Sequence, residues 1–328
     1  MILAGDCGGT KTNLALYRLA GKRLLPARFR SFPSREYPSL PAIIADFLRD
    51  GARPGLASVG AAGPVRGGEV RFTNLSWVAS ETEIRRACGA SRVYLINDLQ
   101  ATAFSIPFLS RRDVAVVQPG RREPRATIAV VAAGTGLGQA FLVRAGDRLL
   151  PVATEGGHVD FAPRNEREFR LLGYLQSRYG HVSAERVVSG PGLHAVYRFV
   201  TEAERVREVP PVAARFAAED APFVIAQEGQ GRRSRACREA LRLFVSLYGA
   251  VAGNAALQGA AAGGVYLAGG LAPAVLPLLR RGPFLSSFRD KGRFRDFLAG
   301  IPVRAILSGR AVLVGAARYA LAREEEGT

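Results

Sequence analysis

The pattern of hydrophobic and polar residues at the start of the chain predicts a β-hairpin over residues 2–19. An apolar strand leads into Asp6, a turn of glycines and threonines follows, and the next residues alternate around Leu14 and Leu16. A period of two is typical of a half-buried strand. The chain therefore opens with two strands joined by a glycine-rich turn.

Similar patterns predict the remaining elements of the first third. Ser80 and Glu83 form a capping box, which marks the start of a helix. The expected strands are Leu24–Phe32, Leu56–Ala62, Val70–Phe72 and Val93–Ile96, and the expected helices are Ser39–Asp50 and Ser80–Cys88.

The second half repeats the opening, with an apolar strand, a turn at Gly134, Thr135, Gly136 and Gly138, and another strand. Two copies of this pattern predict a duplicated α/β fold with a cleft between the halves. The final helix is expected to pack back on the first half. The expected strands are Thr127–Ala133, Gln139–Val143, Arg148–Ala153, Val265–Ala268 and Val303–Leu307, and the helices are Asn165–Gly180, Ala184–Val188, Leu193–Glu204, Ser234–Leu257 and Ala311–Arg323.

The first turn collects groups that suit a phosphate and its metal ion: Asp6, Gly8, Gly9, Thr10 and Thr12. One alternative is a Walker A loop, because a lysine and a threonine follow the turn, but that loop must open a helix, and a strand is expected here. Another alternative is an ordinary hairpin whose glycines serve only a positive φ.

The second turn offers a matching phosphate loop at Gly134, Thr135 and Gly136. Its glycines are spaced G-x-G-x-G and precede a strand, so the dinucleotide-binding fingerprint does not fit. After a later buried strand, Gly269 and Gly270 would let the backbone approach an adenosine ring.

Asn97 and Asp98 end an apolar strand, where open α/β sheets bind their ligands. Asp98 is therefore a candidate general base. The alternative is a helix N-cap, a position that Asp and Asn favour.

Glu155, Gly156, Gly157 and His158 combine a carboxylate and an imidazole that could bind several hydroxyl groups. The alternative is a turn in which the glycines serve geometry and the histidine is a satisfied, partly buried residue. Glu185 could add a hydroxyl acceptor, or it could lie on a solvated helix face.

Composition narrows the class of protein. The 328 residues, 48% of them hydrophobic, can bury a large core, and no apolar run is long enough for a membrane span or signal peptide. We therefore expect a cytoplasmic protein with no membrane partner. The net charge of +17 comes from dispersed arginines without aromatic interleaving, so no nucleic-acid partner is expected. The three cysteines and three histidines lack metal-ligand spacing.

Taken together, these stretches resemble bacterial glucokinases of the sugar kinase, Hsp70 and actin superfamily. The matching segments are DCGGTKTNLALY, FTNLSW, NDLQATA, AAGTGLGQA, EGGHVDFAP, GHVSAERVVSGPGL, VYLAGG and DKGRF. The resemblance implies a duplicated ribonuclease H-like (actin-like ATPase) fold with an interdomain active-site cleft. Its smaller domain would span residues 1–108 plus about 309–328, and its larger domain residues 109–308.

The resemblance also implies transfer of the ATP γ-phosphoryl group to the 6-hydroxyl of glucose, and a homodimer would be usual. Asp98 would be the base, and Asp6 would organise Mg²⁺ through water. The sugar would contact Asn74, Asn97, Glu155, His158 and Glu185, the phosphates would contact the two glycine turns, and the nucleoside would lie near Ser189, Gly190, Gly269 and Gly270.

Two other classes of function stay open at this point: a sugar-sensing regulatory protein, and a phosphohydrolase acting on nucleotides or polyphosphate. Lys11, where relatives often have a smaller polar residue, and the segment 308–312, which lacks the family's Asp, Asn and Pro, depart from the family pattern.

Overall fold

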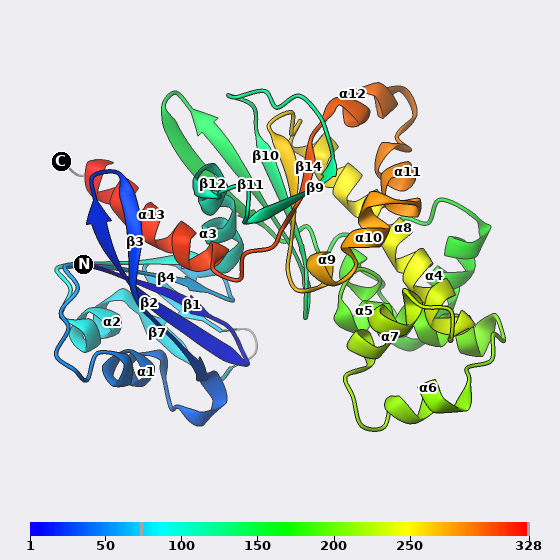
Figure 1. Ribbon diagram of the computed structural model, residues 1–328, viewed down its shortest axis with the longest axis horizontal. Helices are drawn as coiled ribbons and strands as arrows, with labels where there is room; N and C mark the ends of the chain where they lie inside the picture. Colours follow the sequence, from blue (N-terminus) through cyan, green and yellow to red (C-terminus); the bar gives the residue numbers. More distant parts are fainter. Residues whose placement is uncertain (73–74, 327–328) are drawn as a thin grey trace. The chain divides into compact units, whose positions relative to one another are not determined.

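A computed structural model gives the fold and describes residues 1–72 and 75–326. The chain divides into two compact units (Figure 1). The first comprises Met1–Ser110, Ala145–Ala153 and Ser308–Thr328, and the second comprises Arg111–Arg144 and Thr154–Leu307.

The first unit contains a mixed sheet with its strands in the order β3-β2-β1-β4-β8. The hairpin strands β1 and β2 pair antiparallel, and β1 also pairs in parallel with β4, which pairs in parallel with β8. The elements are β1 (Ile2–Cys7), β2 (Lys11–Ala20), β3 (Arg23–Pro33), α1 (Leu40–Phe47), β4 (Leu56–Ala61), β5 (Val65–Arg66), β6 (Glu69–Arg71), β7 (Val78–Ser80), α2 (Glu81–Cys88), β8 (Arg92–Asn97) and α3 (Asp98–Ser105).

The second sheet has the order β12-β11-β10-β13-β14-β9. Up to β14 this order repeats that of the first sheet, and β10 again pairs antiparallel with the next strand and in parallel with β13. The strands are β9 (Val114–Gln118), β10 (Ile128–Ala133), β11 (Leu137–Ala145), β12 (Arg148–Thr154), β13 (Gly264–Ala268) and β14 (Val303–Ile306). The predicted duplication is confirmed by this repeated topology.

The helices after the first third belong largely to the second unit. They are α4 (Glu166–Tyr179), α5 (Gly190–Arg198), α6 (Pro210–Arg215), α7 (Ala221–Gly229), α8 (Arg235–Gln258), α9 (Leu271–Ala274), α10 (Leu276–Arg280), α11 (Pro283–Arg289), α12 (Arg295–Gly300) and, in the first unit, α13 (Ala311–Glu326). The sequence analysis missed β9 and the short helices α6, α7 and α9–α12. These segments are too short to show a clear period.

Local sequence signals explain several boundaries. The predicted capping box of α2 is present, because Ser80 Oγ accepts from Glu83 N and the Glu83 carboxylate accepts from Ser80 N. Asn165 caps α4 and Gly180 ends it. The expected helix over Ala184–Val188 is instead a 3₁₀ turn at Ala184–Arg186.

The long helix α8 is the central element of the larger hydrophobic core. Its apolar face includes Leu241, Phe244 and Tyr248, which are fully buried. Among the described residues, α8 is also the one helix whose length and composition would allow it to cross a membrane, but 72% of the relevant window is buried inside the structure. A core helix has this combination of properties.

The final helix α13 packs on the first sheet, as expected. Leu313, Ala317 and Ala320 share a buried cluster with Ile2 and Ala4 of β1. Helix α3 lies so close to α13 that a Cβ on Gly315 would overlap the backbone of Ala101. This glycine permits the two helices to approach closely.

Substitution by alanine at two mid-helix glycines should therefore change the free energy of unfolding in opposite directions. Gly315→Ala should lower the free energy of unfolding by about 1–3 kcal/mol, because the added methyl group overpacks the α3–α13 contact. Gly173→Ala should raise it by about 0.5–1 kcal/mol, because a Cβ on this residue of α4 meets nothing within 4 Å. Urea denaturation of both variants measures the difference, and an increase for Gly315→Ala would contradict the close packing.

Candidate active site

The register of the first sheet brings the predicted phosphate loop and the candidate base to one edge. Cys7, Ala61 and Asn97 end the parallel neighbours β1, β4 and β8 and are paired across the sheet. Gly60 of β4 pairs with Asp6 of β1 and with Ile96 of β8, and a Cβ there would press on Val312 and approach Asp98 Cα at 3.6 Å. The sequence analysis missed this glycine, which no local pattern marks.

The first glycine turn is a hairpin turn, so the Walker A alternative is wrong. Gly8 N donates to Lys11 O at 3.0 Å, and Lys11 begins strand β2. Neither Gly8 nor Gly9 has a positive φ. The alternative that these glycines serve only a left-handed backbone conformation is therefore also wrong.

A series of hydrogen-bonded polar side chains holds the backbone of this turn in place. Thr12 is 0% exposed, and its hydroxyl lies 3.3 Å from Cys7 Sγ and 2.9 Å from Ser34 Oγ. Ser34 Oγ in turn donates to Gly8 O at 2.8 Å. Burial raises the pKa of Cys7 to about 12, so its thiol stays protonated and can donate to Thr12.

This arrangement corrects the role expected for Thr12. Its hydroxyl is used inside the protein and is not offered to a ligand, whereas Thr10 is exposed at the tip of the turn. Ser34 was missed because it lies 22 residues away from Thr12 and meets it only through the pairing of β2 and β3.

Asn97 is the N-cap of α3, and Asp98 is the first helical residue. Asn97 Oδ1 accepts from Leu99 N at 2.9 Å and from Gln100 N at 3.3 Å, and its Nδ2 donates to Gly63 O at 3.1 Å. The capping alternative raised for Asp98 thus applies to Asn97. The side chain of Asn97 also hydrogen-bonds the Asp98 carboxylate, which lowers the pKa of that group against the effect of burial.

Asp98 lies in surroundings that favour its neutral form. Burial is the main cause that raises its pKa to about 6, and the charge of Asp6 adds to the effect, while the N–H of Leu99 opposes it. The pKa of Asp6 is also raised by burial, against a 3.1 Å hydrogen bond from Asn13 Nδ2. The two carboxylates therefore form an electrostatically coupled pair in the first unit.

The second glycine turn is held by the segment before α5. Gly134 N donates to Gly136 O at 2.9 Å, and Gly134 O accepts from Gly190 N at 2.7 Å. Glu185 Oε2 accepts from Leu137 N at 2.9 Å, just after the turn. One oxygen of Glu185 is therefore committed to positioning this loop, a role that the sequence analysis did not foresee.

The stretch from Glu155 to His158 exposes its functional side chains. The side chains of Glu155 and His158 are 82% and 62% exposed, and His158 Nε2 lies 4.0 Å from Glu155 Oε2. A Cβ on Gly157 would overlap Leu137 O, so this glycine does serve geometry. The alternative of a satisfied, partly buried histidine is wrong.

Of the four positions expected near the nucleoside, Gly190 holds the second glycine turn, and the other three have different structural roles. Ser189 is 1% exposed and caps α5, accepting from Gly192 N and donating to Glu185 O. Gly269 has a φ of +80° and lies against Ala133, so its glycine is required by the backbone. A Cβ on Gly270 would meet nothing within 4 Å, which leaves open space beside this residue.

Gly270 borders a cavity of about 640 Å³ in the second unit. The cavity is lined by Gly134, Thr135, Gly190, Pro191, His194, Asp220, Ala221, Pro222, Gly270 and Leu271. The predicted phosphate loop and the predicted nucleoside region are thus joined in one pocket. Asn74, the remaining predicted site residue, lies outside the described residues.

The glucokinase family profile matches residues 3–323. The chain is 38% identical to the glucokinase of Nostoc punctiforme over 333 residues, which cover 97% of this chain and 98% of that protein. The chain belongs to the glucokinase family. Membership makes it an enzyme of the hexose kinase type and confirms the resemblance seen in the sequence.

Solved structures of glucokinases support the assignment. Glucokinase from an Antarctic psychrotroph is 29% identical, with a TM-score of 0.86 and 98% of both chains covered. A ROK family glucokinase from Streptomyces griseus, in complex with glucose and AMPPNP, is 20% identical, with a TM-score of 0.67 and 98% of this chain and 99% of that chain covered. The expected actin-like ATPase fold is thereby confirmed.

The raised pKa of Asp98 predicts a pH-dependent gain in stability for Asp98→Asn. The folded state retains this proton up to about pH 6, whereas the unfolded chain loses it near 3.8, so stability falls as pH rises through this window. The variant should be more stable than the wild type by ~1–3 kcal/mol at pH 8 and similar to it below pH 4. Urea denaturation in chelator-containing buffer tests this, and a variant that is less stable at pH 8 would count against the burial of the charge.

Proposed function

We propose that this chain transfers the γ-phosphoryl group of ATP to the 6-hydroxyl of D-glucose, giving glucose 6-phosphate and ADP. The observation that carries the proposal is Asp98, a carboxylate at a sheet edge with a pKa of about 6. Such a group is largely ionised at neutral pH and yet basic enough to accept a proton. Asp98 would take the proton of the sugar hydroxyl as that oxygen attacks phosphorus.

The phosphates of ATP would bind to the two glycine turns, Gly8–Thr10 and Gly134–Gly136. Neither Gly134 nor Gly136 has a positive φ, and a Cβ on Gly134 would meet nothing within 4 Å. Backbone strain therefore does not explain the glycine at 134, whereas close approach of a ligand does. The nucleoside would lie beside Gly190 and Gly270.

Asp6 would hold Mg²⁺ through water. Magnesium prefers hard oxygen ligands and commonly uses one or two carboxylates together with substrate phosphates. Asp6 fits this demand, because its raised pKa reflects a buried negative charge that a cation would stabilise. When bound, the ion would neutralise charge on the phosphates, while Asn13 keeps the Asp6 carboxylate oriented.

Glucose would be bound by the remaining polar groups. Glu155 and His158 offer exposed side chains, Asn97 lies beside the proposed base, and Glu185 retains one carboxylate oxygen. Asn74 is part of the same proposal. The proposed base belongs to the first unit, and Glu155 and His158 belong to the second.

A coupled assay of ADP release tests the proposed function. ADP release that requires both glucose and ATP is expected. Release without sugar would favour a phosphohydrolase, and glucose binding without any release would favour a regulatory protein. The cytoplasmic location and a homodimer stay predictions.

Substitution of the proposed base gives a sharper test. Asp98→Asn should lower kcat by about 10²–10⁴-fold while glucose still binds, because only proton transfer is lost. In the wild type, kcat/KM should fall as pH drops below about 6, where Asp98 becomes protonated. Calorimetric titration with glucose checks binding, and near-normal turnover of the variant would refute the assignment.

Glu185 and Glu155 should differ in which substrate they affect. Glu185→Ala should raise KM for both ATP and glucose, because the carboxylate holds the loop at Leu137 as well as facing the sugar. Glu155→Ala should raise KM for glucose alone, since its side chain is exposed and lies near His158. Initial-rate kinetics with each substrate varied would separate the two, and an unchanged KM for ATP in Glu185→Ala would contradict the loop-positioning role.

A further inference from the structure

One residue that lines the cavity of the second unit belongs to neither the sequence motifs nor the glycine turns described above. Asp220 lies on its wall, on the side formed by Ala221 and Pro222. It precedes α7, and its Oδ2 accepts from Phe223 N at 3.3 Å as the N-cap. Asp220 is exposed, so the carboxylate remains accessible to a ligand.

The lining of this cavity is polar at Thr135, His194 and Asp220 and otherwise apolar or glycine. Asp220 is the sole acidic residue among the lining residues, which include Pro191, Pro222 and Leu271 as apolar surfaces. The glycine turn at Gly134 and Thr135 forms another part of the wall. An anionic phosphate is repelled by a carboxylate and attracted by backbone N–H groups, so a nucleotide is oriented with its phosphates at the turn.

His194 adds a neutral polar group to the same wall. Its ring stacks on Phe216 with an interplanar angle of 10°. Partial burial, followed by the nearby charge of Arg198, lowers the pKa of His194. The lowered pKa favours the neutral imidazole, and the nearby charge of Asp220, which acts in the opposite direction, does not reverse the shift.

We propose that Asp220 selects ribonucleoside donors by accepting hydrogen bonds from the ribose hydroxyl groups. This inference rests on the proposed nucleotide donor and deepens it, because it assigns a specificity residue to the nucleoside end of the pocket. A carboxylate has lone pairs for both hydroxyls in addition to the helix cap. The cavity of about 640 Å³ is within the range usual for ligands of this size.

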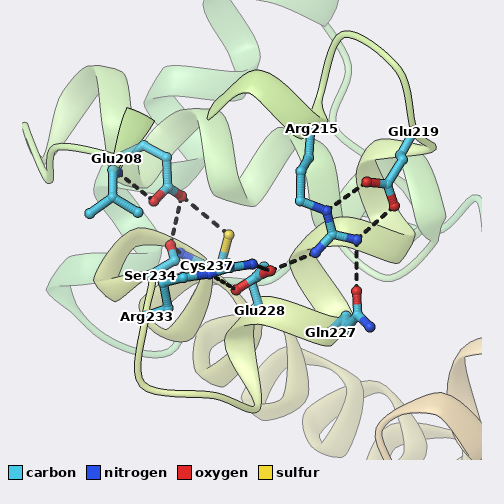
Figure 2. Close-up of polar contacts among 9 residues, drawn as sticks. Glu208, Arg215, Glu219, Gln227, Glu228, Arg233, Ser234 and Cys237 are labelled. Atoms are coloured by element: carbon cyan, nitrogen blue, oxygen red, sulfur yellow. Dashed lines mark hydrogen bonds and ion pairs between the residues drawn. The ribbon is translucent and has the colours of Figure 1, made fainter. Parts of the chain in front are cut away.

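The backbone around Asp220 is anchored by an ion-pair network, shown in Figure 2. Arg215 donates to both oxygens of Glu219 at 2.6 Å and to Glu228 at 2.5 Å, and Glu228 also pairs with Arg233. Glu219, the neighbour of Asp220 in sequence, is thus bound by arginine. The preceding residue and the following helix hold Asp220 at the cavity wall.

The test compares donors that lack one ribose hydroxyl. Asp220→Asn retains a good helix cap, so folding should be preserved. Initial rates are measured with ATP, 2′-deoxy-ATP and 3′-deoxy-ATP at saturating glucose. In the wild type, removing at least one of the two hydroxyls should raise KM about tenfold or more, the size expected for a hydrogen bond to a charged group.

Asp220→Asn should raise KM for ATP by a similar factor and reduce the preference for ATP over that deoxy donor to within about threefold. Asp220→Ser, which also caps the helix but is too short to reach a ligand, should lose the preference entirely. Calorimetric titration with ADP in the absence of sugar gives a second readout, in which both variants should bind more weakly than the wild type.

Asp296→Asn is the matched control, because it makes the same change at an exposed carboxylate of α12 that is not among the residues lining the cavity, and its KM for ATP should stay within twofold of the wild type. Equal losses with ATP and both deoxy donors, equal losses in Asp296→Asn, or unchanged KM values in both Asp220 variants would overturn the inference. A wild type that uses no nucleotide with glucose would instead refute the proposed function.

Discussion

Two carboxylates in the first unit are kept where burial and their mutual repulsion both oppose ionisation. Asp6 lies in the first hairpin strand, and Asp98 begins the helix after β8. The pKa of each is raised, mainly by burial. Ionisation of these two buried groups lowers the stability of the ligand-free protein. The packing of the surrounding sheet nevertheless holds both carboxylates in place. In the first unit, the rest of the candidate site supports this pair and the glycine turn of the same hairpin.

The support for each glycine turn comes from outside the turn. Under the first turn, Cys7, Thr12 and Ser34 form a continuous chain of hydrogen-bonding groups that ends at Gly8 O. At the second, Glu185 and Gly190 bind the backbone from the segment before α5. A loop fixed in this way can present backbone N–H groups to a ligand without first becoming ordered, which lowers the entropic cost of binding.

The same topology explains why the two halves of the chain offer similar loops with different partners. In both sheets a hairpin strand lies in parallel beside the next core strand. The carboxyl ends of these parallel strands share one edge, where the chain places its polar and glycine-rich segments. In the first unit that edge bears Asp98, and in the second it bears Gly269 and Gly270, so the duplicated topology places different residue types at equivalent edges.

The sequence by itself determined the duplicated order of strands, both glycine turns, the capped helices and the candidate base, because each depends on local periodicity or local turn chemistry. The sequence could not predict the structural roles of Thr12, Ser34 and Glu185. Their hydrogen-bond partners are distant in the chain and are brought near only by strand pairing or loop packing. Nor could the sequence show that Asn97, and not Asp98, caps α3, because both residue types suit that position and only backbone geometry distinguishes them. Tertiary structure decided these points, because burial and long-range hydrogen bonding determine which polar groups are used within the protein and which remain for a ligand.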